Sequence, residues 1–159
     1  MRPALAAALL ISMTARAGVA QADPPADDSH AVPHVPASIA DWAHGARLFE
    51  GLGDFHRGVT SSSALAQQYF DQGMRLLWAF NHDESTRSFA RAAELDPACA
   101  ACYWGVALTV GPNYNLPSMA EARARVAWEA LHRAQENAAP ASSVEQALIS
   151  ALAVRYPAP

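Results

Sequence analysis

The sequence predicts an all-α fold, and three observations indicate it. Alanine supplies 37 of the 159 residues, about 23%, and alanine has the highest helix propensity of all residues. From residue 61 onward, apolar residues recur every three or four positions, as they do on one face of a helix. No segment shows the alternation of apolar and polar residues between hairpin turns that is typical of strands. The length is that of a single domain.

The first 22 residues have the features of a secretory signal peptide. Arg2 precedes an apolar run over residues 4–13, and a small-x-small cleavage site ends at Ala22. This run is too short to cross a bilayer, which takes about 20 residues; the alternative is a buried N-terminal helix. We therefore expect export to the periplasm or the medium. Loss of Arg2 and Arg16 changes the formal charge from −4 to 9 − 15 = −6.

The charge balance excludes some partners. All 11 basic residues are arginines, and they are outnumbered by 15 acids. A mildly acidic chain lacks the basic surface that nucleic acids require, so we expect no nucleic-acid partner. Because no apolar stretch after the signal reaches bilayer-spanning length, we also expect no membrane span in the mature protein.

Residues 23–60 are predicted to be a proline- and glycine-rich linker with one short helix. Residues 23–37 hold four prolines and three acids. His30 and His34 lie there with helical spacing, but the neighbouring prolines exclude a regular helix, so solvated histidines are favoured over a metal pair. Apolar spacing then predicts a helix over residues 39–49, followed by a glycine-rich loop.

Residues 61–159 are predicted to form a helical array. Apolar periodicity and breakers place its helices at residues 64–80, 83–95, 98–110, 118–138 and 142–156. The third helix ends at Gly111, which is followed by a proline. The expected helix starts are Asn81 before Glu84, Asp96 before Pro97, Ser118 before Glu121 and Ser142 before Glu145.

An ordered set of aromatic, small and apolar residues lies between residues 69 and 97: Tyr69, Gly73, Leu76, Ser85, Phe89, Ala92 and Pro97. This order resembles the tetratricopeptide repeat (TPR), from which it departs at Gln72, Leu76 and Ser85. A shift of 34 residues, the repeat length, places Tyr103 on Tyr69 and Ala107 on Gly73. The resemblance implies antiparallel helix hairpins in a right-handed solenoid of about two and a half repeats.

The packing expected of such hairpins depends on residue size. Gly73 and Ser85 are small enough for the first two helices to cross closely, and Ala92 allows the next helix to dock. Tyr69 and Phe89 would fill the space on either side of the crossing. In the long helix that follows, the expected small, aromatic and apolar packing residues are Ala124, Trp128 and Leu131.

A narrower resemblance covers residues 52–115, which contain the segments FDQG, FNHDE, LDP-x-CA, YWGVAL and GPNYN. These segments resemble those of exported bacterial TPR proteins of undetermined function. Members of that group are usually longer and carry further repeats. A solenoid normally ends in a polar capping helix, so we expect this chain to be truncated or to be a gene fragment.

The resemblance also implies a binding groove along the first helix of each hairpin. Its residues here are Gln67, Phe70, Met74, Leu77 and Trp78, then Ala101, Trp104 and Leu108. Two interpretations are open for this apolar surface. It is a pocket for an apolar helix or an extended peptide, or residues 38–58 fold back and fill it with Trp42, Leu48, Phe49 and Phe55.

Cys99 and Cys102 form the one chemically suggestive pair. They are expected in the first turn of a helix, where the helix dipole favours a thiolate. Three interpretations are open: packing thiols or a local structural disulfide, an exposed reversible disulfide, or metal or redox chemistry. No histidine follows Cys102 and no second ligand pair exists, so haem and zinc sites are not supported. For His56 and His82, turn capping or local packing is favoured over ligation.

Together these features predict an exported TPR scaffold that binds an unidentified protein or peptide, with no cofactor, no metal and no catalysis of its own. The alternative is a periplasmic redox or metal accessory protein that uses Cys99 and Cys102. A third possibility is a non-functional fragment of a longer repeat protein. The sequence shows no Ser-His-Asp order, no paired carboxylates in an apolar setting and no phosphate-binding glycine loop.

Overall fold

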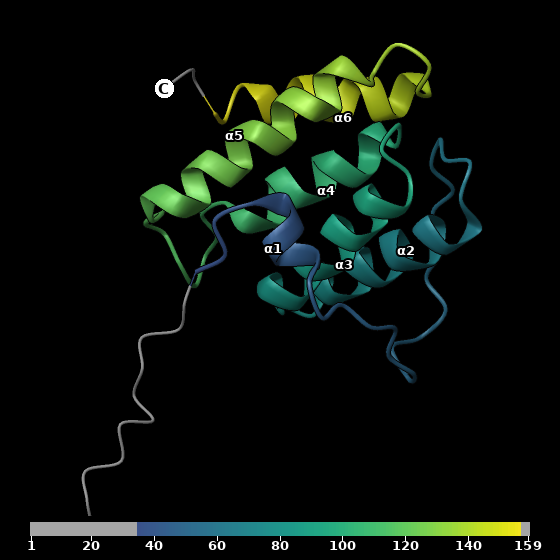
Figure 1. The fold of residues 1–159 in the computed structure, drawn as a ribbon, viewed down its shortest axis with the longest axis horizontal. Helices are drawn as coiled ribbons and strands as arrows, with labels where there is room; N and C mark the ends of the chain where they lie inside the picture. Colours follow the sequence, from purple (N-terminus) through teal and green to yellow (C-terminus); the bar gives the residue numbers. More distant parts are fainter. Residues whose placement is uncertain (1–34, 157–159) are drawn as a thin grey trace, which may run out of the picture. The chain divides into compact units, whose positions relative to one another are not determined.

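A computed structural model describes residues 35–156, and this part of the chain is all-helical, as predicted (Figure 1). The predicted signal peptide, residues 23–34 of the predicted linker with His30 and His34, and residues 157–159 lie outside the described residues. Within the described range, no helix combines the length and the apolar character needed to cross a bilayer.

The described range contains six helices: α1 Ile39–Ala43, α2 Ala64–Trp78, α3 His82–Leu95, α4 Ala100–Val110, α5 Glu121–Glu136 and α6 Ser143–Ala153. Helices α2 to α6 are the five predicted for the array, with ends that differ by three residues or fewer. The prediction of a helix over residues 39–49 was wrong in length. Helix α1 ends at Ala43 because Gly45 adopts a φ of +75°, which no helix continues through.

Two of the four predicted helix starts are confirmed. The Asn81 side chain accepts a hydrogen bond from the Glu84 N–H, and Ser142 forms a complete capping box with Glu145. The other two were wrong. Asp96 ends α3 while Cys99 caps α4, and α5 begins after Ala120 without a side-chain cap.

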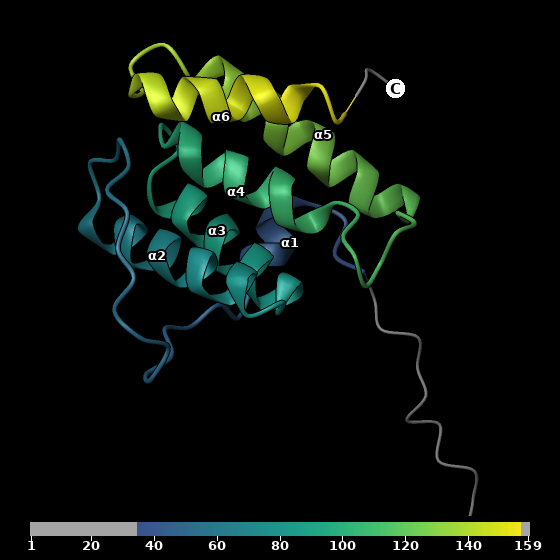
Figure 2. The same cartoon turned by 180° about the vertical axis from the view of Figure 1, so that it is seen from behind.

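Successive helices of the array pack against each other: α2 on α3, α3 on α4, α4 on α5 and α5 on α6. Helix α4 also contacts α2 and α6, whereas α1 packs on α3. Figure 1 shows α1 in front of α3 and α4, and the reverse view in Figure 2 brings α2 and α6 forward with α1 behind. The array therefore has one side formed by α2, α4 and α6 and an opposite side that carries α1.

The ring of Phe89 is the centre at which α2, α3 and α4 meet. Phe89 is fully buried, and a Cβ added to Gly73 would lie 2.7 Å from its ring. A Cβ on Gly105 of α4 would lie 2.4 Å from the same ring, so only glycine fits at either position. The Ser85 hydroxyl donates to the Gly73 carbonyl at 2.6 Å, which joins the first hairpin at its crossing.

The remaining residues predicted to pack the repeats are distributed unevenly. Tyr69, Ala92 and Ala107 are buried, Tyr103 is half-buried, and Pro97 lies exposed in the turn between α3 and α4. On α5 the predicted register was wrong, because Trp128 is 41% exposed and Ala124 is only half-buried, although Leu131 is buried. The buried face of α5 consists of mostly small side chains that permit close packing: Val126, Ala127, Ala130, Leu131 and Ala134.

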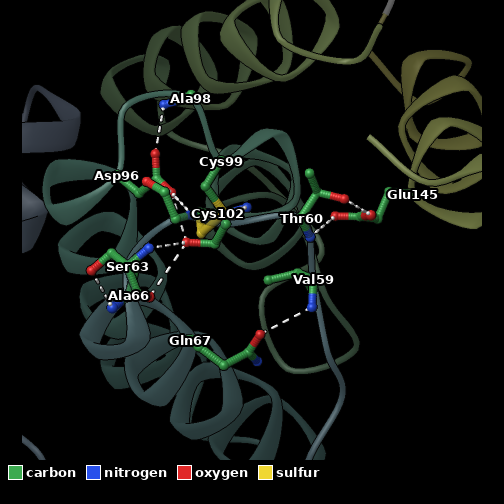
Figure 3. Close-up of a disulfide and its surroundings, with 12 residues drawn as sticks. Val59, Thr60, Ser63, Ala66, Gln67, Asp96, Ala98, Cys99, Cys102 and Glu145 are labelled. Carbon is green, nitrogen blue, oxygen red and sulfur yellow. Dashed lines mark hydrogen bonds between the residues drawn. A yellow bond between two sulfur atoms is a disulfide. The ribbon is translucent and has the colours of Figure 1, made fainter. Parts of the chain in front are cut away.

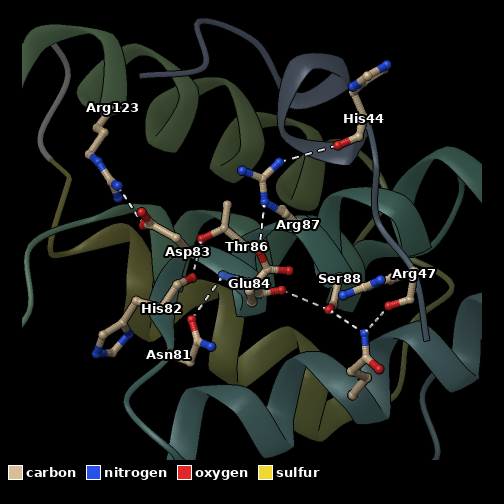
Figure 4. Close-up of polar contacts among 11 residues, drawn as sticks. His44, Arg47, Asn81, His82, Asp83, Glu84, Thr86, Arg87, Ser88 and Arg123 are labelled. Carbon is tan, nitrogen blue, oxygen red and sulfur yellow. Dashed lines mark hydrogen bonds and ion pairs between the residues drawn. The ribbon is translucent and has the colours of Figure 1, made fainter. Parts of the chain in front are cut away.

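Helix α1 is attached through Trp42 to the side of the array opposite α2, α4 and α6. The Trp42 ring is buried, and the guanidinium groups of Arg87 and Arg123 lie 5.9 and 5.1 Å from its centre. Arg123 of α5 also donates to Asp83 of α3 at 2.6 Å, and Arg87 donates to the His44 carbonyl at 3.3 Å (Figure 4). Trp42 therefore lies away from the side formed by α2, α4 and α6.

Candidate functional site

Residues 47–62, here called the strap, connect α1 to α2 and cross to the side formed by α2, α4 and α6 (Figure 2). Polar side chains of α2 bind the first half of the strap through its backbone. Gln72 accepts from the Phe49 N–H at 2.7 Å and donates to the Arg47 carbonyl at 2.8 Å. The Arg75 guanidinium donates to the Phe55 carbonyl at 2.6 Å. These bonds to the first half of the strap do not depend on the strap's own side chains.

Two further side chains of α2, one and two turns before Arg75, also bind the strap backbone. Asp71 accepts from the Arg57 N–H at 3.1 Å, and its other oxygen lies 2.7 Å from His56 Nδ1. Gln67 accepts from the Val59 N–H at 3.0 Å and donates to the Arg57 carbonyl at 2.9 Å. Gln67 was predicted to line the groove, and in the structure its amide is bound to the strap.

Two buried carboxylates on other helices hold the second half of the strap (Figure 3). Glu145 of α6 accepts from the Thr60 N–H at 2.9 Å and from the Thr60 hydroxyl at 2.8 Å. Asp96, at the end of α3, accepts from the Ser62 N–H and the Ser61 hydroxyl, both at 2.7 Å. The strap therefore links α2 to both α3 and α6.

Burial and hydrogen bonding act in opposite directions on these two carboxyl groups. Burial is the largest single influence and raises the pKa of Glu145, but the hydrogen bonds from Ser142 and Thr60 together lower it below its ordinary value. Burial likewise raises the pKa of Asp96, and the bonds from Ser61, Ser62 and Ala98 outweigh it, so the pKa of Asp96 is also lowered. Both groups favour the charged form that holds the strap.

The residues predicted to line an open groove are covered over part of its length. Phe70, Met74, Ala101 and Trp104 are buried, with Phe70 only 1% and Trp104 only 9% exposed. The Val59 side chain lies with Phe70, Ala101, Trp104 and Leu148 around a residual space of about 10 Å³. Such a space is at the lower limit for one water molecule. Of the two interpretations left open by the sequence, the structure favours the one in which the segment before α2 folds back and fills this part of the groove.

The residues that cover the groove are not those predicted to do so. Trp42 lies on the other side of the array, Leu48 and Phe55 are exposed, and Phe49 is half-buried beneath the Arg47 guanidinium. Val59 and Thr60 cover it instead. The sequence feature that could have indicated this cover is the β-branched pair Val59-Thr60 after Gly58. Such a pair does not reveal that Thr60 contacts Glu145, 85 positions away.

The other end of α2 carries an exposed apolar surface, here called the aromatic end and formed by Leu77, Trp78 and Phe80. Trp78 is 69% and Phe80 is 66% exposed, while Leu77 is half-buried. The predicted groove residue Leu108 of α4 is also half-buried. Trp78 and Leu77 were predicted as groove residues, whereas Phe80 was predicted only as part of the helix.

Phe80 is held in an unfavourable backbone conformation. Its φ is +59°, and it is the one residue other than glycine in the described range with a positive φ. It follows the last turn of α2, where the Asn81 N–H bonds the Leu76 carbonyl at 2.9 Å. Glycine usually occupies this position after a helix, because a side chain there is strained. Strained backbone positions are often found at functional sites, so Phe80 is a candidate site residue.

His82 lies next to Phe80 at the start of α3. The two rings meet edge-on with 6.1 Å between their centres. The His82 carbonyl accepts from the Thr86 hydroxyl at 2.8 Å, while neither ring nitrogen has a hydrogen-bond partner within the described residues. His82 therefore packs locally through its ring.

Cys99 and Cys102 are joined by a disulfide at the start of α4 (Figure 3). Both residues are fully buried, and Cys99 Sγ accepts from the Cys102 N–H at 3.2 Å. The Cys99 N–H in turn bonds the Asp96 carbonyl at 3.0 Å. This geometry agrees with a local structural disulfide and disagrees with an exposed, reversible one. Within residues 35–156, no three His, Cys, Asp or Glu side chains are grouped to hold a metal ion.

A larger cavity of about 550 Å³ lies beside α5, outside the predicted groove. It is lined by Met119, Glu121, Ala124, Arg125, Trp128, Arg155 and Tyr156. The Tyr156 hydroxyl donates to the Ala107 carbonyl at 2.7 Å, an approach that requires glycine at position 111. The exposed Trp128 ring, stacked on His132, faces this region instead of the core.

No protein-family model, no curated protein and no solved structure matches the chain.

Proposed function

We propose that the chain is an exported TPR scaffold that binds a protein or peptide partner through the aromatic end and has no catalysis of its own. The order of helix contacts supports the TPR assignment, because each helix packs on the next and α4 also contacts α2 and α6. The crossing of α2 and α3 at Gly73 and Ser85 is of the kind that the repeat requires.

The observation that carries the binding proposal is the pair Trp78 and Phe80. Two large aromatic residues, each about two-thirds exposed, lie two positions apart in the sequence at the end of α2, and one of them is held in a strained backbone conformation. Contiguous exposed apolar surface marks interaction sites in soluble proteins. Aromatic residues also contribute most to the affinity of protein interfaces.

A capture experiment with matched variants tests this proposal. The purified mature chain is immobilised and exposed to the periplasmic and medium fractions of its source cells. We expect a discrete partner that the wild type retains and W78S loses. The control is Y114S, because Tyr114 is 92% exposed on the loop between α4 and α5 and is remote in sequence from the aromatic end. Equal capture by wild type and W78S would contradict the proposal.

The export proposal has a separate test. The mass of the protein recovered from cells identifies its first residue. We expect cleavage after Ala22, as the small-x-small pattern predicts. Recovery of the uncleaved chain from the cytoplasm alone would contradict export and would leave the binding proposal unchanged.

A further inference from the structure

We propose that residues 57–60 occupy the groove in the place of a partner, and that the partner which displaces them is an extended peptide with a small branched apolar residue followed by a hydroxyl residue. This inference rests on the proposed function and adds to it the class of ligand and the control of access. Three features of the contacts between strap and groove support it.

The first feature is that the groove binds groups that every peptide has. Gln67 contacts the Val59 N–H and the Arg57 carbonyl, and Asp71 contacts the Arg57 N–H. Glu145 contacts the Thr60 N–H from the other side of the groove. An extended peptide in the same register would form the same four bonds, as in other modes of extended-peptide recognition.

The second feature is a selective pocket for side chains. Phe70, Ala101, Trp104 and Leu148 surround Val59 and leave about 10 Å³, so a side chain larger than valine requires rearrangement of buried aromatic rings. The next position is selected by a hydroxyl, because the Thr60 Oγ1 donates to Glu145 at 2.8 Å. These contacts define the sequence class: a small branched apolar residue, then threonine or serine.

The third feature is that the strap is held weakly enough to be displaced. Within residues 57–60, Gly58 is exposed and Val59 is the one apolar side chain packed against the groove, while the strap residues Leu48 and Phe55 are more than 40% exposed. The other contacts of residues 57–60 with the groove are hydrogen bonds to Gln67, Asp71 and Glu145. A displacing peptide would form the same bonds with the groove as the strap does. The groove contacts alone therefore favour neither the strap nor the peptide. Segments with few apolar contacts open locally while the core stays folded.

The aromatic end supplies the additional contact. Trp78 follows Gln67 by 11 residues on α2, which corresponds to about 16 Å along the helix axis. About five residues of extended chain span this distance. One peptide can therefore contact the aromatic end first and then replace the strap at Gln67 and Glu145.

The test is direct binding of a labelled peptide with the sequence of residues 54–62, measured by fluorescence anisotropy on the full chain. V59D places a charge in the apolar pocket and should release the strap. We expect V59D to bind the peptide at least about tenfold more tightly than the wild type, whose groove is occupied. The matched control is L48D, which makes the same change at an exposed strap residue and should bind like the wild type. A peptide with aspartate in place of its valine should not bind V59D.

A second substitution locates the binding. V59D/Q67L lacks the amide that contacts the backbone, so we expect it to lose the gained affinity, about tenfold. A folded V59D that fails to bind the peptide, or wild type and V59D that bind it equally, would overturn the inference. Binding that survives in V59D/Q67L would also overturn it, because the peptide would then lie elsewhere.

Hydrogen exchange on the wild type keeps the test decisive if V59D does not fold. At millimolar peptide, which is comparable to the effective concentration of a tethered segment, the amides of Arg57, Val59 and Thr60 should exchange faster. Unchanged exchange would overturn the inference. The capture experiment with W78S is independent, so a partner captured through the aromatic end without any displacement of the strap would refute this inference alone.

Discussion

The surroundings of Phe89 and the strap are held in place by different kinds of contact. Around Phe89, three helices meet where glycine is required at residues 73 and 105, and the ring is fully buried. The strap is held by side chains of α2, α3 and α6 that bind its backbone. Side-chain volume therefore determines how the helices of the array pack, whereas polar contacts hold the strap over the groove.

The largest effect is expected at Phe89. F89A removes the ring at the meeting point of α2, α3 and α4 and should lower the free energy of unfolding by about 3–5 kcal/mol. Urea denaturation followed by circular dichroism measures it. A loss below about 1 kcal/mol would show that this centre does not dominate the array.

A smaller effect is expected from one added methyl group. G105A places a Cβ 2.4 Å from the Phe89 ring, and we expect a net loss of about 1–2 kcal/mol, after alanine's better helix propensity is allowed for. G58A is the control in the strap, where an added Cβ meets nothing within 4 Å. Its unfolding free energy should stay unchanged or rise slightly, because alanine restricts the unfolded chain. Equal losses in the two variants would contradict the contrast between the regions.

Acid should act on the strap before it acts on the array. The pKa values of Glu145 and Asp96 are lowered in the folded protein, so their contribution to stability is complete at neutral pH and is lost as the pH falls below about 4. Amide exchange is measured at pH 3 and at pH 4 and corrected for the intrinsic rate. We expect protection to increase more at Val59 and Thr60 than at Phe89. An equal or smaller increase at Val59 and Thr60 would show that the carboxylates play no part.

Substitution of the carboxylates sharpens the acid experiment. E145Q and D96N keep the size of the side chain and remove the charge, and each should weaken the strap by about 1–2 kcal/mol at pH 7 because hydrogen bonds to charged groups are the stronger ones. The double variant should also lose most of the dependence of strap protection on pH. A pH dependence that persists unchanged would assign it to other groups.

The sequence predicts the first of these regions well and the second poorly. The resemblance to the TPR pattern pointed to Gly73, Ser85 and Phe89, and their sizes explain why they pack at a helix crossing. Gly105 was not singled out, although it contacts the same ring. On α5 the alanine-rich sequence allows more than one packing register, and Trp128 was assigned to the buried side although it is exposed.

The covered groove could not be predicted for a different reason. Val59 and Thr60 reach it from a loop, where no periodicity indicates which side chains will bind the backbone. Glu145 was identified as a capping residue, but its bond to Thr60 joins positions 85 residues apart. The strain at Phe80 also depends on where α2 ends, and the sequence placed that end two residues too late.

The most direct test of the account is a double measurement on F80G. Glycine relieves the strain of a φ of +59°, so we expect the melting temperature to rise, by an amount equivalent to about 1 kcal/mol, while capture of the partner is lost. This opposite movement of stability and binding cannot come from unfolding. An F80G variant that is more stable and captures the partner as well as the wild type would contradict the claim that the aromatic end is the binding site.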